Sequence, residues 1–561
     1  MNHRGPLPWL LVVTAVAWAG LRHAGFCWDD GALVADNRLT SALDWAHLRA
    51  MFQADLWETL SLPAPASGYY RPLFLVSLAI DQVVLGPEPG PHHLHSLAWH
   101  LAAVALLYRL LRQLIPEHWL PATAGAALFA LHPVQTEAVA LIAARNDSMA
   151  AVFLLAVLLL LLPERPRPAA LGAAGLAAMA GLLSKESVVL APLALLVLDL
   201  ARRGRPGRWA RQVPVLAGLG AAMGLRVWAG VGGAAVPDPG NWSLVLGRLP
   251  EILGTYLGLL VWPSPLTPAR HLSYLEPLGQ LWPAALVALV ILAGMLGRSR
   301  APRLGWLGVA WAAATFAPTL LATLDKGLLG ERYLYLPLAG LALTLAAWIP
   351  RNVAAAGVAA GVAALLGAGV SQRLPAWESS RVLWQAAHDA LPSPFTHAGL
   401  AFYVNRDGDP EQARLHYLKA IEGDPPYRDA CSSLVMVYLR LDKPHVAVRM
   451  ADWAMAERGC PPTPDFVDQH ALALAGSGDW NRAARLVREA PHGPSGVGLM
   501  VLGAERFLAG DMAGYQQARQ AWRGQASYPA QVLRLFGLTG QERAARALAQ
   551  VIDDEARPVD E

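Results

Sequence analysis

Charged residues are scarce in this chain of 561 residues: they make up 16% of it, whereas hydrophobic residues make up 55%. Soluble globular domains usually carry about 25% charged residues. The formal net charge is only +3, and the arginines lie between apolar segments instead of gathering on one basic face. The composition therefore indicates a membrane protein with several spans, and it argues against nucleic acid as a partner.

Cysteine and lysine are also rare. The three cysteines, Cys27, Cys431 and Cys460, form no C-x-x-C pair, so neither a zinc knuckle nor a thioredoxin-type site is indicated. A disulfide between Cys431 and Cys460 would require an exported domain, and the spacing alone does not support it. Only four of the 45 basic residues are lysines, and this arginine-rich, alanine-rich composition is typical of a GC-rich bacterium.

Long apolar segments recur along the first two thirds of the chain. A helix needs about 20 residues to cross the ~30 Å hydrocarbon layer of a membrane. We expect eleven such spans, approximately at 7–25, 92–114, 120–136, 147–163, 168–184, 187–202, 211–230, 279–297, 303–322, 332–349 and 352–371. The first has features of a signal peptide, but the apolar segments that follow favour an uncleaved span.

The arginines indicate the topology. With a cytoplasmic N-terminus, and with 244–262 as an interfacial or re-entrant helix, every arginine-rich loop falls on the cytoplasmic side, as the positive-inside rule requires. Counting 244–262 as a full crossing would turn the cluster at 298–303 outward. In the topology without that crossing, the chain after 372 lies on the outer face, together with the first loop, 26–70.

Two adjacent acids, Asp29 and Asp30, follow the first span directly. A charge kept at the edge of a bilayer is a functional hypothesis by default, although a solvated loop can also begin with acids. The outer loops supply further ionisable or hydrogen-bonding candidates: Tyr70, Arg71, His93, His132, Glu137, Arg145, Asp147, Lys185, Glu331, Arg332 and Tyr333. A bundle in lipid needs small and apolar interfaces, so such clusters are hard to explain by folding alone.

Basic groups at the membrane surface suit a lipid-linked phosphate. Arg145, Lys185 and Arg332 are the candidates, since arginine offers bidentate contacts and lysine a point charge. Each could instead belong to an ion pair, such as Lys185 with Asp147. His132 precedes a proline and is most simply a helix terminus. A metal at the histidines of 92–100 lacks paired carboxylates at a fitting spacing.

From about residue 394 the composition becomes that of a soluble helical region. Small and large residues in 400–425 recur after a shift of 34 at Leu434, Ala447, Ala451 and Ala454. This period predicts a tetratricopeptide-repeat solenoid of two clear units and a looser third one at 465–491, with capping helices after 494. An ordinary alanine-rich bundle is the alternative.

The ordered set of motifs carries a family resemblance. Trp28-Asp29-Asp30, Tyr70-Arg71-Pro72-Leu73, His132-Pro133-x-x-x-Glu137, Arg145-x-Asp147, Ser184-Lys185-Glu186 and Glu331-Arg332-Tyr333-Leu334 resemble the transmembrane and tetratricopeptide-repeat O-mannosyltransferases of the GT-C glycosyltransferase superfamily. The resemblance covers about residues 7–371. Ser96 stands where the family tends to have an amide, and the repeat array is shorter than in eukaryotic members.

The resemblance implies an all-α protein: a GT-C-type bundle of about eleven transmembrane helices over 1–371, a linker at 372–393 and a repeat solenoid at 394–561. It implies transfer of a mannose-type hexose from a polyprenyl-phosphate carrier to an acceptor hydroxyl of a protein or glycan, with Asp29 and Asp30 as the catalytic pair. We expect Asp29 to act as general base, Asp30 to orient the acceptor or a metal, and the anomeric centre to invert. The resemblance leaves dependence on a divalent metal open.

Two readings compete with a transferase of the bacterial inner membrane whose active site and repeats face the periplasm. A membrane-anchored repeat scaffold for envelope proteins would need one span, not eleven. A transporter would place charges near the bilayer midplane, whereas here they collect at one edge. A transferase acting on a glycan or lipid acceptor also remains open.

Overall fold

The computed structural model describes residues 5–57, 68–232, 239–275, 281–522 and 528–556. Across these ranges the chain is helical, and the one β-bridge recorded joins His271 to Leu328. The chain divides into two compact units, Met1–Ala390 and Leu391–Glu561. The all-α fold class expected from the sequence is therefore confirmed.

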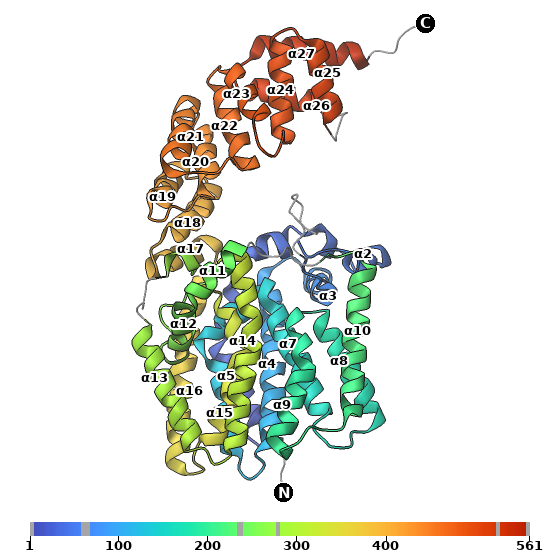
Figure 1. Cartoon of the computed structure of the whole chain (residues 1–561), viewed down its shortest axis with the longest axis vertical. Coiled ribbons are helices and arrows are strands. Elements are labelled where there is room, and N and C mark those ends of the chain that lie inside the picture. The colour runs from blue at the N-terminus through green and yellow to red at the C-terminus, as the bar shows by residue number, and fades with distance from the viewer. Residues whose placement is uncertain (1–4, 58–67, 233–238, 276–280, 523–527, 557–561) are drawn as a thin grey trace. The chain divides into compact units, whose positions relative to one another are not determined.

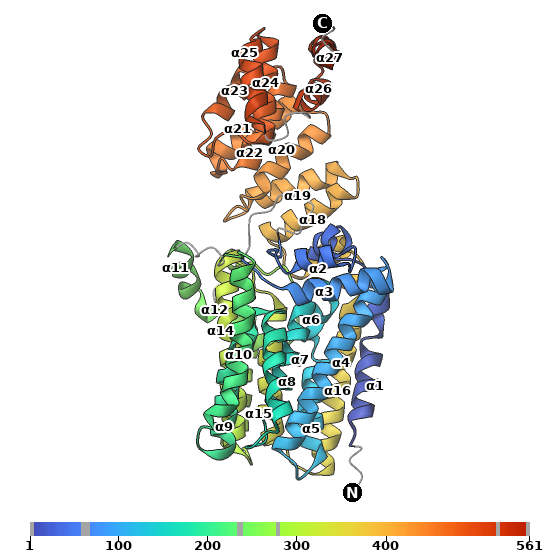
Figure 2. The same ribbon diagram turned by 90° about the vertical axis from the view of Figure 1, so that its right-hand side faces the viewer.

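The first unit is a bundle of long apolar helices that run roughly parallel to one another (Figures 1 and 2). Each expected span corresponds to one helix. These helices are α1 (Leu7–Ala17), α4 (Pro89–Leu114), α5 (Trp119–Leu131), α7 (Arg145–Leu160), α8 (Pro168–Leu182), α9 (Ala191–Arg203), α10 (Gln212–Trp228), α13 (Trp282–Gly297), α14 (Pro302–Lys326), α15 (Tyr335–Trp348) and α16 (Val353–Arg373).

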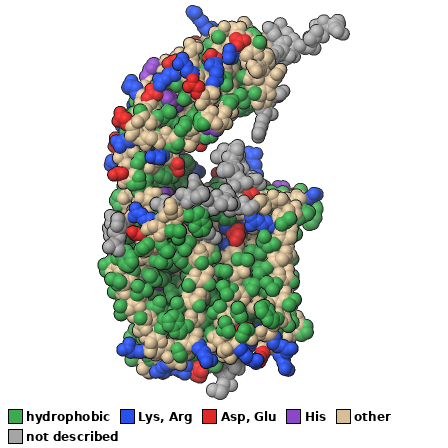
Figure 3. Space-filling model, in the orientation of Figure 1, with side chains coloured by type: hydrophobic (Ala, Val, Ile, Leu, Met, Phe, Trp, Pro, Cys, Tyr) green, Lys and Arg blue, Asp and Glu red, His purple; other side chains and the backbone are tan. Residues whose placement is uncertain are grey.

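Three stretches are long and apolar enough to cross a membrane by length and composition: Pro89–Leu114, Ile142–Leu160 and Val353–Trp377. Several of the other helices are apolar but have 10–17 residues. The count of eleven crossings therefore stays a prediction. On the face that Figure 3 shows, hydrophobic side chains form a broad band across this unit, and charged side chains gather at the edges of the band.

The segment 244–262 is divided between α11 (Pro239–Gly247) and α12 (Leu249–Val261). Because an α-helix rises 1.5 Å per residue, the 13 residues of α12 extend for roughly 20 Å, less than the hydrocarbon layer. Because α5 and α9 have the same length, this length does not separate the interfacial interpretation from a crossing, and the interfacial position stays a prediction. The α12 helix packs against α13.

Short turns break the apolar pattern between α5 and α7. The α5 helix ends before His132, because the residue before a proline disfavours helical geometry, and the His132 side chain accepts the backbone N–H of Val134. The chain then makes α6 (Thr136–Ala140) and the 3₁₀ turn η6 (Ile142–Ala144) before α7 begins. These turns place Glu137, the amides of 142–143 and Arg145 within ten residues.

The expected linker at 372–393 is wrong for most of its length. The turn η11 (Leu374–Trp377) and helix α17 (Ser380–Ala390) belong to the first unit. Trp377 is fully buried, and its carbonyl accepts the backbone N–H of Gly25. Burial of a large aromatic side chain and these backbone contacts fix the segment against the first loop.

The second unit is a series of helix pairs from α18 to α27. They are α18 (Pro394–Arg406), α19 (Pro410–Glu422), α20 (Ala430–Arg440), α21 (Pro444–Arg458), α22 (Pro464–Gly476), α23 (Trp480–Arg488), α24 (Gly496–Leu508), α25 (Met512–Ala521), α26 (Tyr528–Leu538) and α27 (Glu542–Ala556). Short helices continue to residue 556 in the described ranges, and α24 packs against α25 and α26 against α27, so the pairing continues past 494. Assignment to the tetratricopeptide family stays a prediction.

Small buried residues explain how the pairs pack. Ala413, Ala447, Ala451 and Ala483 are fully buried where neighbouring helices meet, which allows close approach of their backbones. A disulfide joins Cys431 in α20 to Cys460, which follows α21. This bond encloses the second helix pair, while Cys27 in the first unit is a free, buried cysteine.

Candidate active site

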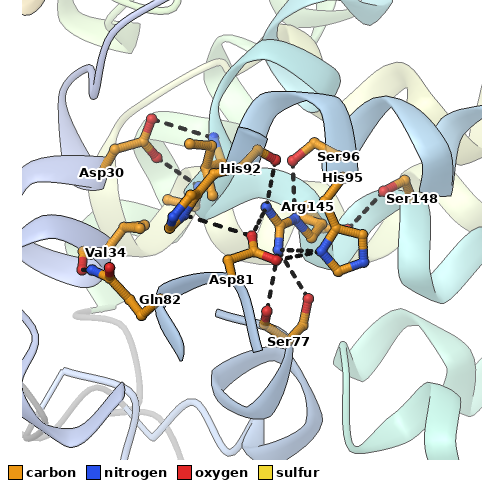
Figure 4. A network of polar contacts seen from close by, with 12 residues as sticks. Asp30, Val34, Ser77, Asp81, Gln82, His92, His95, Ser96, Arg145 and Ser148 are labelled. Atoms are coloured by element: carbon orange, nitrogen blue, oxygen red, sulfur yellow. Dashed lines mark hydrogen bonds and ion pairs between the residues drawn. The ribbon is translucent and has the colours of Figure 1, made fainter. Parts of the chain in front are cut away.

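The two adjacent acids have different surroundings. Asp30 is fully buried, and its carboxylate accepts backbone N–H groups from Cys27, Ile142 and Ala143, the last at 2.7 Å. Figure 4 shows the Asp30 carboxylate directed at the 142–143 backbone. Asp30 therefore joins the first loop to the turn before α7. Its expected role in orienting an acceptor or metal is not supported, because these amides occupy its oxygens.

Asp29 is half-buried and accepts no hydrogen bond from any side chain or amide within the described ranges. Burial raises its pKa above the usual range, the positive charge of Arg332 lowers it, and the negative charge of Glu137 raises it again. A general base is most effective when its pKa lies near the working pH. Asp29 therefore has both the free oxygens and the electrostatic surroundings of a candidate base.

Arg332 and Glu137 form the ion pair beside Asp29. Glu137 is fully buried and accepts both the backbone N–H of Arg332, at 3.0 Å, and its guanidinium. The guanidinium also lies over the rings of Trp28, at 5.8 Å, and Tyr333, at 5.2 Å. Two sequence-predicted candidates, Glu137 and Tyr333, thus position a third.

A second pair of ion pairs lies next to Arg332. Lys185 Nζ is 2.5 Å from Asp147 Oδ1, and Arg71 contacts Glu186 at 2.7 Å. Burial lowers the pKa of Lys185, and this is the largest effect. The negative charge of Asp147 raises the pKa, and the positive charge of Arg332 lowers it. Lys185, Asp147 and Arg71 therefore share one electrostatic environment with Arg332.

Arg145 has a different position from the one expected. Its guanidinium contacts Asp81 at 2.5 Å and donates to Ser96 Oγ, Ser77 Oγ and the His92 carbonyl, with His95 Nδ1 at 3.4 Å (Figure 4). These partners occupy its five N–H groups, and the side chain is fully buried. The geometry therefore argues against Arg145 as a phosphate ligand. Instead, Arg145 connects α7 to α4 and to α3 (Pro72–Ile80).

The predicted histidines and Tyr70 also have buried protein partners. His93 Nε2 lies 3.1 Å from the Gly25 carbonyl, and His132 Nε2 lies 3.1 Å from the Leu260 carbonyl. Tyr70 is buried and donates to the Phe52 carbonyl at 2.9 Å. These contacts within the protein indicate a structural role for all three side chains. Tyr69, its neighbour, instead carries the Arg71 guanidinium over its ring at 4.6 Å.

The sequence interpretation missed Asp81, Arg270 and Arg373. Asp81 lies in an apolar stretch, 72–85, that is shorter than a span, and an acid in such a stretch is itself a signal. Arg270 is buried and lies 3.9 Å from Glu331. Arg373 ends α16 and acts electrostatically on both Glu331 and Glu137. In the sequence, Arg373 resembles the basic residue that usually ends a helix.

No group of three His, Cys, Asp or Glu residues suited to a metal ion occurs within the described ranges. Among the histidines of α4, His92 and His95 both contact Asp81, whereas His100 Nδ1 contacts Tyr335 Oη at 2.8 Å. The candidate site therefore consists of protein carboxylates, guanidinium groups, Lys185 and aromatic rings. Such a set can accept a proton and neutralise an anion.

Comparison with known proteins finds similarity over part of the first unit. Residues 86–228 match the family described as Dolichyl-phosphate-mannose-protein mannosyltransferase. The Drosophila melanogaster Protein O-mannosyl-transferase Tmtc2 is 35% identical over 189 residues, 32% of this chain and 20% of that protein. Through this segment the chain is similar to protein O-mannosyltransferases.

Two further relatives extend the comparison. The Homo sapiens Protein O-mannosyl-transferase TMTC2 is 34% identical over 137 residues, 24% of this chain and 16% of that protein. The matched parts thus span a fifth or less of these two curated relatives. A crystal structure of ArnT from Cupriavidus metallidurans bound to undecaprenyl phosphate covers 82% of this chain and 81% of that one, with 16% identity and a TM-score of 0.38. A similarity of this size does not establish a common fold.

Proposed function

We propose that the chain is a membrane glycosyltransferase that moves a hexose from a polyprenyl-phosphate carrier to an acceptor hydroxyl. The observation that carries the proposal is Asp29: a half-buried carboxylate without a hydrogen-bond partner in the described part of the chain, beside the Arg332–Glu137 pair. The family of the matched segment supports the reaction class.

The reaction needs a proton acceptor and charge neutralisation. Asp29 takes the proton of the acceptor hydroxyl. At the same time, the oxygen of that hydroxyl forms a bond to the anomeric carbon. The bond from that carbon to the carrier phosphate breaks, and its electron pair leaves with the phosphate. Attack opposite to the leaving group inverts the anomeric centre.

Lys185 and Arg332 are the groups proposed to neutralise the phosphate. Each already contacts one carboxylate, Asp147 and Glu137 respectively, which holds it in place. Lys185 retains two further N–H groups beyond that contact, and its side chain is 17% exposed. Arg71, paired with Glu186, adds positive charge nearby. Arg145 is not part of this proposal.

An apolar hollow supports a lipid-linked donor. It lies between α9 and α14 and is lined by Leu190, Leu193, Ala194, Val197, Leu307, Ala310, Trp311, Ala314 and Thr315. Leu190 ends the turn η7 (Glu186–Leu190), whose first residue pairs with Arg71. An apolar chain that enters this hollow would have its head group close to the basic cluster.

The disulfide supports an outer orientation for the second unit. Disulfides persist in oxidising compartments such as the bacterial periplasm and are rare in the cytosol. The Cys431–Cys460 bond, together with the arginine-rich loops, is consistent with a periplasmic active site and repeat unit. A protein or glycan acceptor bound through the repeats is part of the same proposal.

The proposal is tested with the purified full-length protein in detergent. Undecaprenyl-phosphate mannose is supplied with a Ser/Thr-containing peptide, and with a glycan acceptor in a parallel reaction. We expect consumption of the donor and a mannosylated product in at least one reaction. Donor that is neither bound nor consumed, with nucleotide sugar used instead, would reject the carrier assignment.

A further inference from the structure

A second group of charged residues consists of Glu331, Arg270 and Arg373, with Arg270 Nη1 lying 3.9 Å from Glu331 Oε1. Glu331 is 1% exposed, and its Oε1 accepts the backbone N–H of Thr267. Arg270 is 6% exposed and donates to the Pro265 carbonyl at 2.8 Å. Arg373 ends α16, and its charge is the strongest electrostatic influence on Glu331 after burial.

This group is incompletely paired. Glu331 Oε2 and the Nε and Nη2 atoms of Arg373 are buried, and none has a hydrogen-bond partner among the residues that the structure describes. The two side chains influence one another electrostatically without forming an ion-pair contact. Leaving buried polar groups unpaired is costly. A free acceptor atom and a free donor edge in one neighbourhood therefore suggest a ligand that supplies both functions.

The charges restrict the chemistry of that ligand. A phosphate would meet the carboxylates of Glu331 and Glu137, and a metal ion would meet the guanidinium groups of Arg270 and Arg373. Adjacent hydroxyl groups suit both sides, because a hydroxyl donates one hydrogen bond and accepts others. A sugar ring presents such hydroxyls in pairs.

The position of the group relates it to the proposed base. Glu331 immediately precedes Arg332, which influences Asp29. Arg373 immediately precedes η11, whose Trp377 carbonyl accepts the Gly25 amide, and Ser380 Oγ accepts the Trp28 amide. Gly25 and Trp28, which precede Asp29, are therefore hydrogen-bonded to the segment that follows Arg373.

We propose that Glu331 and Arg373, supported by Arg270, form a binding subsite for neighbouring hydroxyl groups of the donor hexose. One hydroxyl donates to Glu331 Oε2, and its neighbour accepts from the Nε–H and Nη2–H groups of Arg373. This inference rests on the proposed transferase function and specifies which part of its donor these residues bind.

The test compares undecaprenyl-phosphate mannose with its 2-, 3- and 4-deoxy analogues. Wild-type protein, Arg373→Lys and Glu331→Gln are assayed in full-length form, both for donor binding by intrinsic tryptophan fluorescence and for turnover. Because a hydrogen bond to a charged group contributes substantially, we expect wild type to bind one deoxy analogue at least about 10-fold more weakly. The variants should bind mannose donor more weakly, yet lose most of this discrimination.

Arg22→Gln is the matched control, since Arg22 is an exposed arginine of the same unit. It should retain wild-type binding and discrimination, and thermal unfolding in detergent checks that every variant is folded. If wild type binds all analogues equally, or if the variants discriminate as wild type does, the subsite is rejected while the transferase function stands. If wild type binds no donor, both proposals are rejected.

Discussion

At the scale of single residues, chemical type and sequence position do not separate Asp29 from Asp30, but their contacts do. Asp30 is bound by three backbone N–H groups, whereas Asp29 faces Arg332 and Glu137. The motif predicts that an acid pair matters. It cannot predict which acid is anchored, because the amides of Ile142 and Ala143 are more than a hundred residues away.

Asp30 gives a prediction about pH. Burial raises its pKa from 3.8 to about 7, partly opposed by its hydrogen bonds to the Ala143, Cys27 and Ile142 amides. The folded state therefore binds a proton more tightly than the unfolded state, so this stabilisation is present below about pH 4 and is lost as pH rises to 7. We expect the Tm of wild type in detergent to fall over this range, and that of Asp30→Asn to fall less.

Asp36→Asn is the control for this prediction, because Asp36 is an exposed acid of the same loop. It should keep the wild-type pH dependence. An Asp30→Asn variant with the same slope as wild type would show that Asp30 does not titrate as described.

Arg145 gives a prediction about stability. Asp81→Asn leaves a buried guanidinium without its counter-ion, which costs about 3–5 kcal/mol in comparable cases. We expect a loss of that size in the free energy of unfolding, measured by denaturant titration in detergent. The double variant Asp81→Leu with Arg145→Met removes both charges and should recover much of the loss. Equal or greater destabilisation of the double variant would contradict the structural role.

At the scale of elements, apolar segments predicted where helices of the first unit occur, and the proline after His132 predicted the end of α5. The same signals could not predict the role of 372–390, because Trp377 and Trp384 are buried by distant segments. Trp384, for example, contacts the ring of Trp28 at 5.8 Å between centroids. The prediction that Arg145 binds phosphate failed to consider its partner Asp81, because Asp81 lies in an apolar stretch too short to be recognised as a span.

The hollow between α9 and α14 gives a prediction about the donor lipid. Ala194→Trp fills it with a large side chain at a position that lines the hollow. We expect a higher KM for a long-chain polyprenyl-phosphate donor, with little change for a donor carrying a short prenyl chain. Ala229→Trp, at the residue that follows α10 and outside the hollow, should affect neither. Equal effects of Ala194→Trp on both donors would contradict a lipid-binding role.

At the scale of the whole molecule, two compact units with different compositions follow each other, and the change in composition near 394 predicted the boundary to within a few residues. The 34-residue period predicted the pairing of helices up to α23. The regular pairs beyond 494 were missed, because their small residues no longer keep the period although the helices still pack.

The disulfide gives a prediction about the compartment of the second unit. Protein unfolded in denaturant without reductant should react with maleimide at one thiol, Cys27, and at three after reduction. Trapping the thiols in intact cells before lysis keeps the native redox state. Three reactive thiols without reductant would argue for a reducing compartment and against a periplasmic second unit.

The central claim is that Asp29 accepts the proton of the acceptor hydroxyl. The most direct measurement is single-turnover transfer from undecaprenyl-phosphate mannose by Asp29→Asn, alongside donor binding and with Asp36→Asn as control. The account predicts donor affinity within a few-fold of wild type and a loss of transfer of at least about 100-fold, the usual contribution of a general base. Transfer at the wild-type rate by a folded, donor-binding Asp29→Asn variant would contradict it.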